Sequence, residues 1–171
     1  MTGVNPRHPW WRLLSVVFLL AGARPVGPAA APAPEFGTLE RDVARRINAH
    51  RVARRLPPLA YDAAVAAIAR AHSRDMATGR VPMGHDGFER RTGLVERILP
   101  LQAIAENVAL NDYGTASTVR IAVEGWLASA HHLENIEGQY DITGVGVARA
   151  RDGTFYYTQL FVRRLPSAGR R

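Results

Sequence analysis

Apolar residues recur at helical spacing in the first part of the chain. Leu39, Val43 and Ile47 are four residues apart, which predicts one face of a helix. Thr38 precedes this stripe and is a suitable N-cap, and the prolines of the segment LPPL that follows Arg55 stop the helix. The folded domain is therefore expected to begin with this helix.

Two further segments show the same periodicity. Asp62 is the expected N-cap of a second helix, which ends before Gly79 and Pro82. The apolar stripe of this helix consists of Val65, Ile68, Ala69, His72 and Met76. A third helix is indicated by the spacing of Val119, Ala122, Val123, Trp126 and Leu127.

The region between the second and third helices, residues 94–110, shows no clear period. Leu94 to Leu99 is typical of a short helix, which Pro100 breaks. The segment AENVA at 105–109 is compact and mostly apolar, but its type is left open.

The pattern changes towards the C-terminus. Residues 143–148 alternate β-branched and small side chains, and Asp152-Gly153 is a hairpin signal. Residues 154–162 are rich in aromatic and β-branched side chains, which predicts a strand buried on at least one face. Helices that come first and an antiparallel hairpin that comes last predict the α+β class rather than a βαβ repeat.

Composition narrows the class of protein. The chain has 171 residues, of which 47% are apolar, enough for one domain with a core. The formal charge is +7, and no lysine occurs, so every permanently cationic side chain is an arginine. No nucleic-acid-reading motif accompanies the scattered arginines, so we expect no nucleic-acid partner. Cysteine is absent, so stability depends on the core and not on disulfides.

The first residues have the features of a secretory signal. Arg7 and Arg12 precede and flank an apolar run, residues 13–23, that is short for a transmembrane helix. We expect residues 1–23 to be a signal peptide, with residue 31 as the alternative boundary. Its removal leaves no stable transmembrane span, whereas the competing interpretation is an uncleaved N-terminal anchor.

The remaining sequence divides into three parts. Residues 24–37 are Pro/Ala-rich and are expected to be a linker, residues 38–164 the folded domain, and residues 165–171 a basic tail. This organisation predicts a protein that is secreted or held in the cell envelope.

Three polar residues are not explained by packing. His85 lies in a glycine-flanked loop, Glu106 lies inside the apolar segment AIAENVAL, and His132 follows the third expected helix. A carboxylate among apolar neighbours needs a partner, and histidines are natural partners. Such a set binds a divalent metal, performs acid–base chemistry or forms a buried hydrogen-bond network. Spacing alone does not select one of the three.

Other candidate residues point to structure rather than chemistry. No HExxH motif occurs, and Ser129 lacks the GxSxG elbow of a serine hydrolase. We expect His72, on the apolar stripe of the second helix, to be a core or loop-anchoring residue, and His50 to be solvated. The aromatic residues expected in the core are Trp126, Phe155, Tyr157 and Phe161.

Seven short motifs occur in an order that resembles a known family. They are an asparagine in the first helix followed by LPPL, then AHSRDMA, the loop histidine, ENVA, WLASAHHLENI, GVGVA and YYTQLF. Together they resemble the CAP superfamily (cysteine-rich secretory proteins, antigen 5 and plant pathogenesis-related proteins), and more closely its bacterial, cysteine-free SCP-domain branch. The resemblance covers residues 38–162 and implies a three-layer α-β-α sandwich with a central antiparallel sheet.

The resemblance also implies a surface cleft lined by two histidines and two acids. His85 matches the first cleft histidine, Glu106 the glutamate of the family's GEN motif, and His132 the histidine of SPGHRxNI. Ser129 stands where many members carry the second acid, so the set of four is incomplete here. Two imidazoles and one carboxylate still supply three metal ligands, so the loss weakens the acid–base interpretation more than the metal interpretation.

The function that the resemblance implies is a secreted, non-enzymatic binding module. Its expected cleft residues are His85, Glu106, His132 and Ser129, and the first three are the candidate ligands of a divalent cation such as Zn²⁺. A small lipid-like molecule is the other candidate occupant, and the partner is an extracellular or cell-envelope ligand of unknown identity. The alternative is a metal- or histidine-dependent hydrolase of the peptidase type, for which no catalytic residue is assigned.

Overall fold

The computed structural model describes residues 34–166. The expected signal peptide, most of the expected linker and residues 167–171 lie outside this range. Every described helix and strand belongs to one compact unit, Pro32–Arg171. None of the described helices is long and apolar enough to cross a lipid bilayer.

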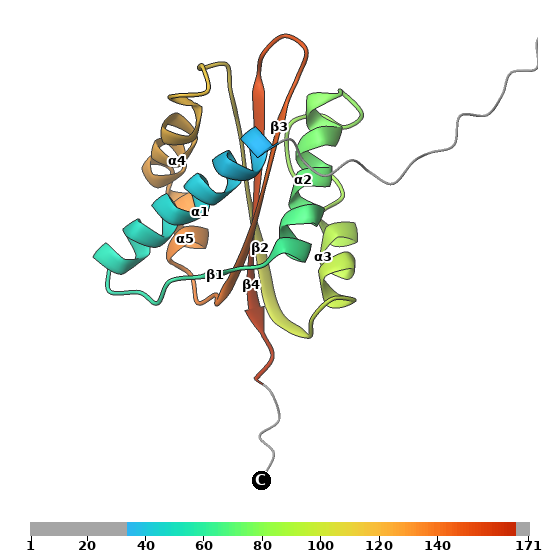
Figure 1. The fold of residues 1–171 in the computed structure, drawn as a ribbon. Helices are drawn as coiled ribbons and strands as arrows, with labels where there is room; N and C mark the ends of the chain where they lie inside the picture. The colour runs from blue at the N-terminus through green and yellow to red at the C-terminus, as the bar shows by residue number, and fades with distance from the viewer. Residues whose placement is uncertain (1–33, 167–171) are drawn as a thin grey trace, which may run out of the picture. The chain divides into compact units, whose positions relative to one another are not determined.

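The described residues form five helices and four strands. In chain order these are α1 (Pro34–Ala53), β1 (Ala60–Tyr61), α2 (Ala63–Ala77), α3 (Phe88–Glu96), β2 (Leu101–Asn111), α4 (Thr118–Ala128), α5 (Ala130–Glu137), β3 (Ile142–Arg149) and β4 (Phe155–Arg164). The sheet order is β1-β3-β4-β2, antiparallel except for β1, which runs parallel to β3. Helices α1, α4 and α5 lie on one side of the sheet, and α2 and α3 lie on the other (Figure 1). The α+β class and the three-layer sandwich are therefore confirmed.

Strand β4 separates two hydrophobic cores because its side chains alternate between the two faces of the sheet. Tyr157 and Phe161 pack into the core beneath α1, α4 and α5. Leu160 and Val162 point to the other face and pack against α2 and α3. The aromatic residues expected in the core, Trp126, Phe155, Tyr157 and Phe161, are at most 1% exposed, which confirms their assignment.

The expected start of the first helix is wrong. Helix α1 begins at Pro34, so Thr38 lies inside the helix and residues 34–37 are helical rather than linker. The third expected helix is confirmed as α4, which Ser129 ends with extended backbone angles (φ −104°, ψ 121°) before the separate helix α5 begins. His132 follows α4, as expected, and lies on the short helix α5, which the sequence analysis did not predict.

Residues 94–110, whose apolar side chains show no clear period, contain the end of helix α3 and most of the long strand β2. Helix α3 ends at Glu96, so the helix expected over residues 94–99 is confirmed for its first half and wrong for its second half. Residues 105–109 belong to β2, which pairs with β4 so that Glu106 lies opposite Leu160. Glu106, Asn107 and Asn111 are polar but buried, and this interrupts the apolar pattern by which such a strand is recognised.

Helix side chains satisfy backbone groups at both edges of the sheet. Strand β1 covers only two residues of β3, and beyond it the N–H of Val147 donates to Oε1 of Glu40 at 3.2 Å. Glu40, which is buried in α1, also accepts from Nε of Arg70 at 2.7 Å. At the opposite edge, Nε1 of Trp126 donates to the carbonyl of Val108 at 2.9 Å. At each edge, a backbone group is thus hydrogen-bonded by a helix side chain rather than by a further strand.

Helix α2 approaches β3 at two glycines. A Cβ on Gly146 would lie 2.1 Å from the backbone nitrogen of Arg70, and one on Gly144 would lie 2.3 Å from that of Ala66. Both obstacles are backbone atoms, so a change of side-chain rotamer relieves neither. The glycines of GVGVA therefore set the distance between α2 and the sheet.

Gly146→Ala is expected to lower the free energy of unfolding by about 3 kcal/mol, because α2 must move away from the sheet to admit the methyl group. Gly125→Ala is the control: nothing lies within 4 Å of the added Cβ on α4. That change is expected to stabilise the protein by up to about 1 kcal/mol, since alanine is the better helix former. Urea unfolding measures both, and equal midpoints for the two variants would contradict this account of the α2–β3 contact.

Candidate functional site

The carboxylate of Glu106 is buried in the middle of β2 and is held by an arginine. Nε of Arg91 donates to Oε2 of Glu106 at 2.6 Å, and Nη2 of Arg91 donates to Oε1 at 2.7 Å. Both side chains are 2% exposed. This two-pronged geometry matches the planar guanidinium to the carboxylate, and it offsets the desolvation of both charges.

Arg91 uses its remaining N–H groups to fix the loop that precedes α3. Nη1 donates to the carbonyl of Asp86 at 2.7 Å, and Nη2 donates to the carbonyl of His85 at 3.2 Å. The loop can turn here because Gly84 and Gly87 have positive φ angles of 149° and 76°. One buried guanidinium therefore joins strand β2 to the histidine loop.

His72 anchors the same loop from helix α2. Nη1 of Arg91 donates to Nδ1 of His72 at 3.1 Å, so Nδ1 is the acceptor and the proton resides on Nε2. Nε2 then donates to the carbonyl of Gly84 at 2.8 Å. Burial lowers the pKa of His72, and the nearby charge of Arg91 lowers it further, while the bond to Gly84 opposes both effects. The expectation that His72 anchors a loop is confirmed.

His85 is brought to Glu106, as the sequence analysis expected. Its Nδ1 lies 2.9 Å from Oε1 of Glu106, and its side chain is 55% exposed. Because a carboxylate only accepts hydrogen bonds when ionised, Nδ1 is the donor. The other ring nitrogen, Nε2, has no hydrogen-bond partner among residues 34–166.

His132 is linked to the same place through two asparagines. Nδ2 of Asn107 donates to the backbone carbonyl of His132 at 3.1 Å. Nδ2 of Asn135 donates to Oδ1 of Asn107 at 2.9 Å, and to the carbonyl of Glu106 at 3.3 Å. These contacts fix α5 beside the middle of β2.

The ring of His132 is partly buried. Burial lowers its pKa, and the nearby charges of His85 and His131 lower it further. Its Nδ1 is buried without a hydrogen-bond partner in the described part of the chain. His85 and His132 are thus close enough for the charge on one ring to affect the other.

The described residues do not form a three-ligand metal site. No group of three or more histidine, aspartate or glutamate side chains within residues 34–166 is arranged to hold a metal ion. Both oxygens of Glu106 are already used by Arg91. Ser129, the other expected cleft residue, occupies the N-cap position of α5 and makes no side-chain capping bond.

Sequence analysis missed Arg91, Asn107 and Asn135. The two asparagines carried a signal, because they are the polar positions of the motifs ENVA and HHLENI that packing did not explain. Arg91 carried none, since it stands beside Arg90 in an exposed-looking charged segment. The sequence assignment of His50 is also wrong: its Nε2 lies 2.8 Å from Oε1 of Glu137, so it is paired rather than free in solvent.

Arg91→Gln is expected to destabilise the protein by about 3 to 5 kcal/mol, because it leaves the buried carboxylate of Glu106 without its cation. Arg90→Gln is the matched control, since Arg90 is the exposed neighbour on the same helix. The double variant Arg91→Met with Glu106→Gln should recover much of the loss, because no buried charge remains. Chemical unfolding measures all three, and an Arg91 variant as stable as the control would refute the role of this pair.

Acid is expected to destabilise the fold partly through His72. Because its pKa in the folded protein lies below the ordinary 6.5, the unfolded chain binds the proton more tightly. Stability is therefore full above that value and falls as the pH drops below it. His72→Gln has no proton to gain, so between about pH 7.5 and 5.5 it should lose less stability than the native chain. Urea midpoints at the two pH values measure the difference, which should be absent if His72 is not the titrating group.

Comparisons with known proteins agree with this fold. Residues 44–161 match the family model of the cysteine-rich secretory protein family. A Bacillus subtilis (strain 168) protein described as the uncharacterized membrane protein YlbC is 33% identical over 132 residues, which is 74% of this chain and 35% of that protein. This chain therefore spans about a third of that relative's length.

Solved structures show the same architecture. An extracellular protein containing a SCP domain from Bacillus anthracis str. Ames is 27% identical with a TM-score of 0.62, over 80% of this chain and 45% of that one. An outer surface protein of Borrelia burgdorferi has 18% identity and a TM-score of 0.60, over 73% of this chain and 92% of that one, and this likeness concerns the fold alone. Since the family model covers well over half of the sequence, the chain belongs to the cysteine-rich secretory protein (CAP) family.

Proposed function

We propose that this protein is a secreted, non-enzymatic binding module that presents the imidazoles of His85 and His132 to a ligand. The observation that carries the proposal is the pair His85–Glu106, in which Nδ1 lies 2.9 Å from the carboxylate while the side chain is largely exposed. A carboxylate behind one ring nitrogen fixes the tautomer and directs the other nitrogen outward, as it does in histidines that bind metals.

In this proposal Glu106 orients a ligand-binding group and is not itself a ligand. Its two oxygens are held by Arg91, and a metal would have to break those bonds to reach them. His132 supplies the second imidazole. Its lowered pKa keeps the ring neutral near pH 7, which is the form that donates a lone pair to a cation.

The ligand class that fits two imidazoles is a divalent transition-metal cation such as Zn²⁺. Histidine nitrogens suit this ion, and two protein ligands leave positions open for water or for a carboxylate or phosphate group of a larger molecule. The proposal assigns only these two rings as protein ligands, because both oxygens of Glu106 are held by Arg91.

The site is poorly suited to acid–base catalysis. A general base must be free to accept a proton, whereas the carboxylate of Glu106 is held by a permanently charged guanidinium. Ser129 stands where the family's second acid is often found, and its hydroxyl is not activated by a hydrogen-bonded base among the described residues. These features favour binding over hydrolysis.

We also propose that the protein is secreted or held at the cell envelope. The signal-like pattern of residues 1–23 supports this, and the relatives include one described as extracellular and one as an outer surface protein. The Bacillus subtilis relative is described as a membrane protein. The interpretation that competes with a cleaved signal peptide is therefore still an uncleaved N-terminal anchor. The intact mass of the protein, measured in the medium and membrane fractions of its producing cells, separates the two.

Calorimetric titration with ZnCl₂ at about pH 7.5 tests the binding proposal. We expect saturable binding that is lost in His85→Ala and in His132→Ala. His131→Ala is the matched control, because it removes the adjacent, exposed histidine of the same helix and should retain binding. No heat of binding in the native chain, or equal binding in all three variants, would refute the two-imidazole site.

A panel of peptide and ester substrates, with and without Zn²⁺, tests the non-enzymatic part of the proposal. We expect rates no higher than those of buffer. Turnover that disappears in His85→Ala but not in His131→Ala would overturn it in favour of a hydrolase.

A further inference from the structure

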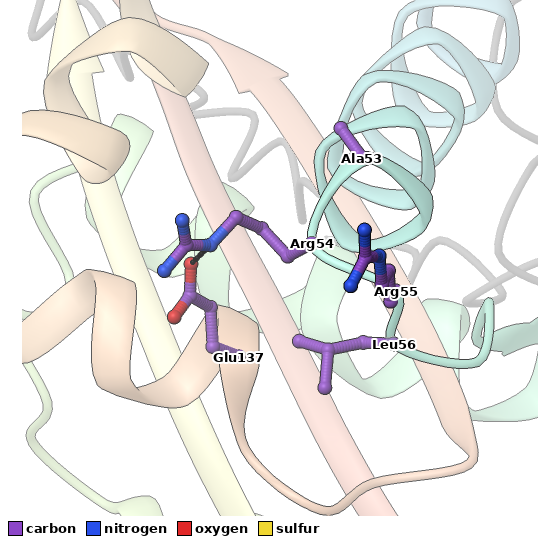
Figure 2. Close-up of a pocket in the computed structure, with 5 residues that line it drawn as sticks. All are labelled: Ala53, Arg54, Arg55, Leu56 and Glu137. Atoms are coloured by element: carbon purple, nitrogen blue, oxygen red, sulfur yellow. Dashed lines mark ion pairs between the residues drawn. The ribbon is translucent and has the colours of Figure 1, made fainter.

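A row of hollows lies near the C-terminal ends of α1 and β4 and beside the connection between α5 and β3. The first, of about 390 Å³, is lined by Ala53, Arg54, Arg55, Leu56 and Glu137 (Figure 2). The second, of about 490 Å³, shares Leu56 with the first and also contacts Arg163 and Arg164. The third, of about 390 Å³, shares these two arginines and adds Leu165. Because neighbouring hollows share residues, they form one continuous surface, which we call the arginine end. None of the three hollows is lined by His72, His85 or His132.

The acidic side chains of the arginine end are already neutralised. Oε1 of Glu137 lies 3.2 Å from Nε of Arg54, the contact drawn in Figure 2, and it also pairs with His50. Oδ2 of Asp141 lies 2.5 Å from Nε of Arg164.

Two arginines of this surface have no acidic partner. Neither Arg55 nor Arg163 forms an ion pair with any other residue in the range 34–166. Both line the hollows described above. The arginine end therefore keeps two exposed positive charges that are available to an anion.

A further guanidinium lies beneath the second hollow. Arg51 is 1% exposed, and it donates to the carbonyls of Pro57, Ile136 and Gly138 at 2.7–2.9 Å. These acceptors are dipoles and carry no net charge, so the positive charge of Arg51 adds to the potential of the hollow that it lines. The surface is more strongly positive than its exposed side chains alone indicate.

Large apolar side chains stand beside these charges. Leu165 is 52% exposed and Ile98 is 46% exposed. The N–H of Leu165 donates to the carbonyl of Pro100 at 3.1 Å, which places Leu165 next to the turn that carries Ile98. Exposed aliphatic side chains next to unpaired arginines fit the boundary between phosphate headgroups and acyl chains.

We propose that the arginine end docks on the surface of an anionic lipid bilayer. Arg55 and Arg163 contact lipid phosphates, and Ile98 and Leu165 enter the acyl boundary. A soluble polyanion would use the arginines but would gain nothing from the two aliphatic side chains, so the combination favours a membrane. This role is independent of ligand binding at His85 and His132.

Vesicle sedimentation tests the proposal. The chain Pro32–Arg171 is used, because it contains every described element and both cores and lacks the apolar run of residues 13–23. We expect binding to vesicles of phosphatidylcholine with about 30% phosphatidylglycerol, weakened by salt, and little binding to pure phosphatidylcholine. Equal binding to the two compositions, or to neither, overturns the proposal.

Two double variants separate the charged and apolar contributions. Arg55→Asn with Arg163→Gln should weaken binding about twentyfold, and asparagine is chosen because Arg55 has a φ of 61°. Ile98→Ser with Leu165→Ser should weaken it about tenfold. If the arginine variant loses binding while the serine variant keeps full affinity, the site is one for soluble polyanions and the membrane proposal is wrong.

Matched controls come from the opposite end of the sheet and from α4. Leu110 is 46% exposed, as Ile98 is, but it lies near the far end of β2 opposite Tyr156. Leu110→Ser and Arg120→Gln should bind anionic vesicles like the native chain, as should His85→Ala. Thermal unfolding of each variant shows that it is folded, and a loss of binding in the controls equal to that of the test variants overturns the assignment to the arginine end.

Discussion

A carboxylate buried halfway along the edge strand β2 is the constraint on which one side of this protein depends. Glu106 cannot stay charged there alone, since desolvation costs several kcal/mol for an unpaired ion. Arg91 supplies the counter-charge, and it does so only because α3 packs against β2 at that point. The guanidinium has more N–H groups than Glu106 can accept, and the rest hold the loop of His85 and the ring of His72. The exposed imidazole is therefore positioned by a buried charge pair.

The elements that sequence analysis predicted well are those in which one apolar period is uninterrupted. Helix α2 and the β3–β4 hairpin are of this kind, and so is α4 up to Ser129. Strand β2 was not recognised, because Glu106 and Asn107 occupy positions where a buried strand normally carries apolar side chains. Helix α5 was also not predicted, since its eight residues are too few to show a clear apolar period. The polar residues of the candidate site thus interrupt the apolar pattern by which strand β2, which carries them, would be recognised.

The sequence motifs predicted only the part of the site whose residues they contain. The pairing of His85 with Glu106 follows from the order of motifs, and the geometry agrees with it. The partner that holds both could not be found, because Arg90 and Arg91 look alike in a sequence and only the packing of α3 buries one of them. The resemblance implied two histidines and two acids, whereas this chain brings two histidines and one acid to the site and adds the buried Arg91.

The contact between Glu40 and the N–H of Val147 has a consequence for self-association. An open strand edge is a template on which other chains pair and aggregate, and a long β-strand such as β3 is exposed to that risk once β1 ends. The carboxylate occupies a donor that an incoming strand would need, and its negative charge, balanced by Arg70, makes the position unfavourable for an added backbone carbonyl. A protein without a single cysteine thereby uses one ion pair to make this edge of its sheet a poor template for an added strand.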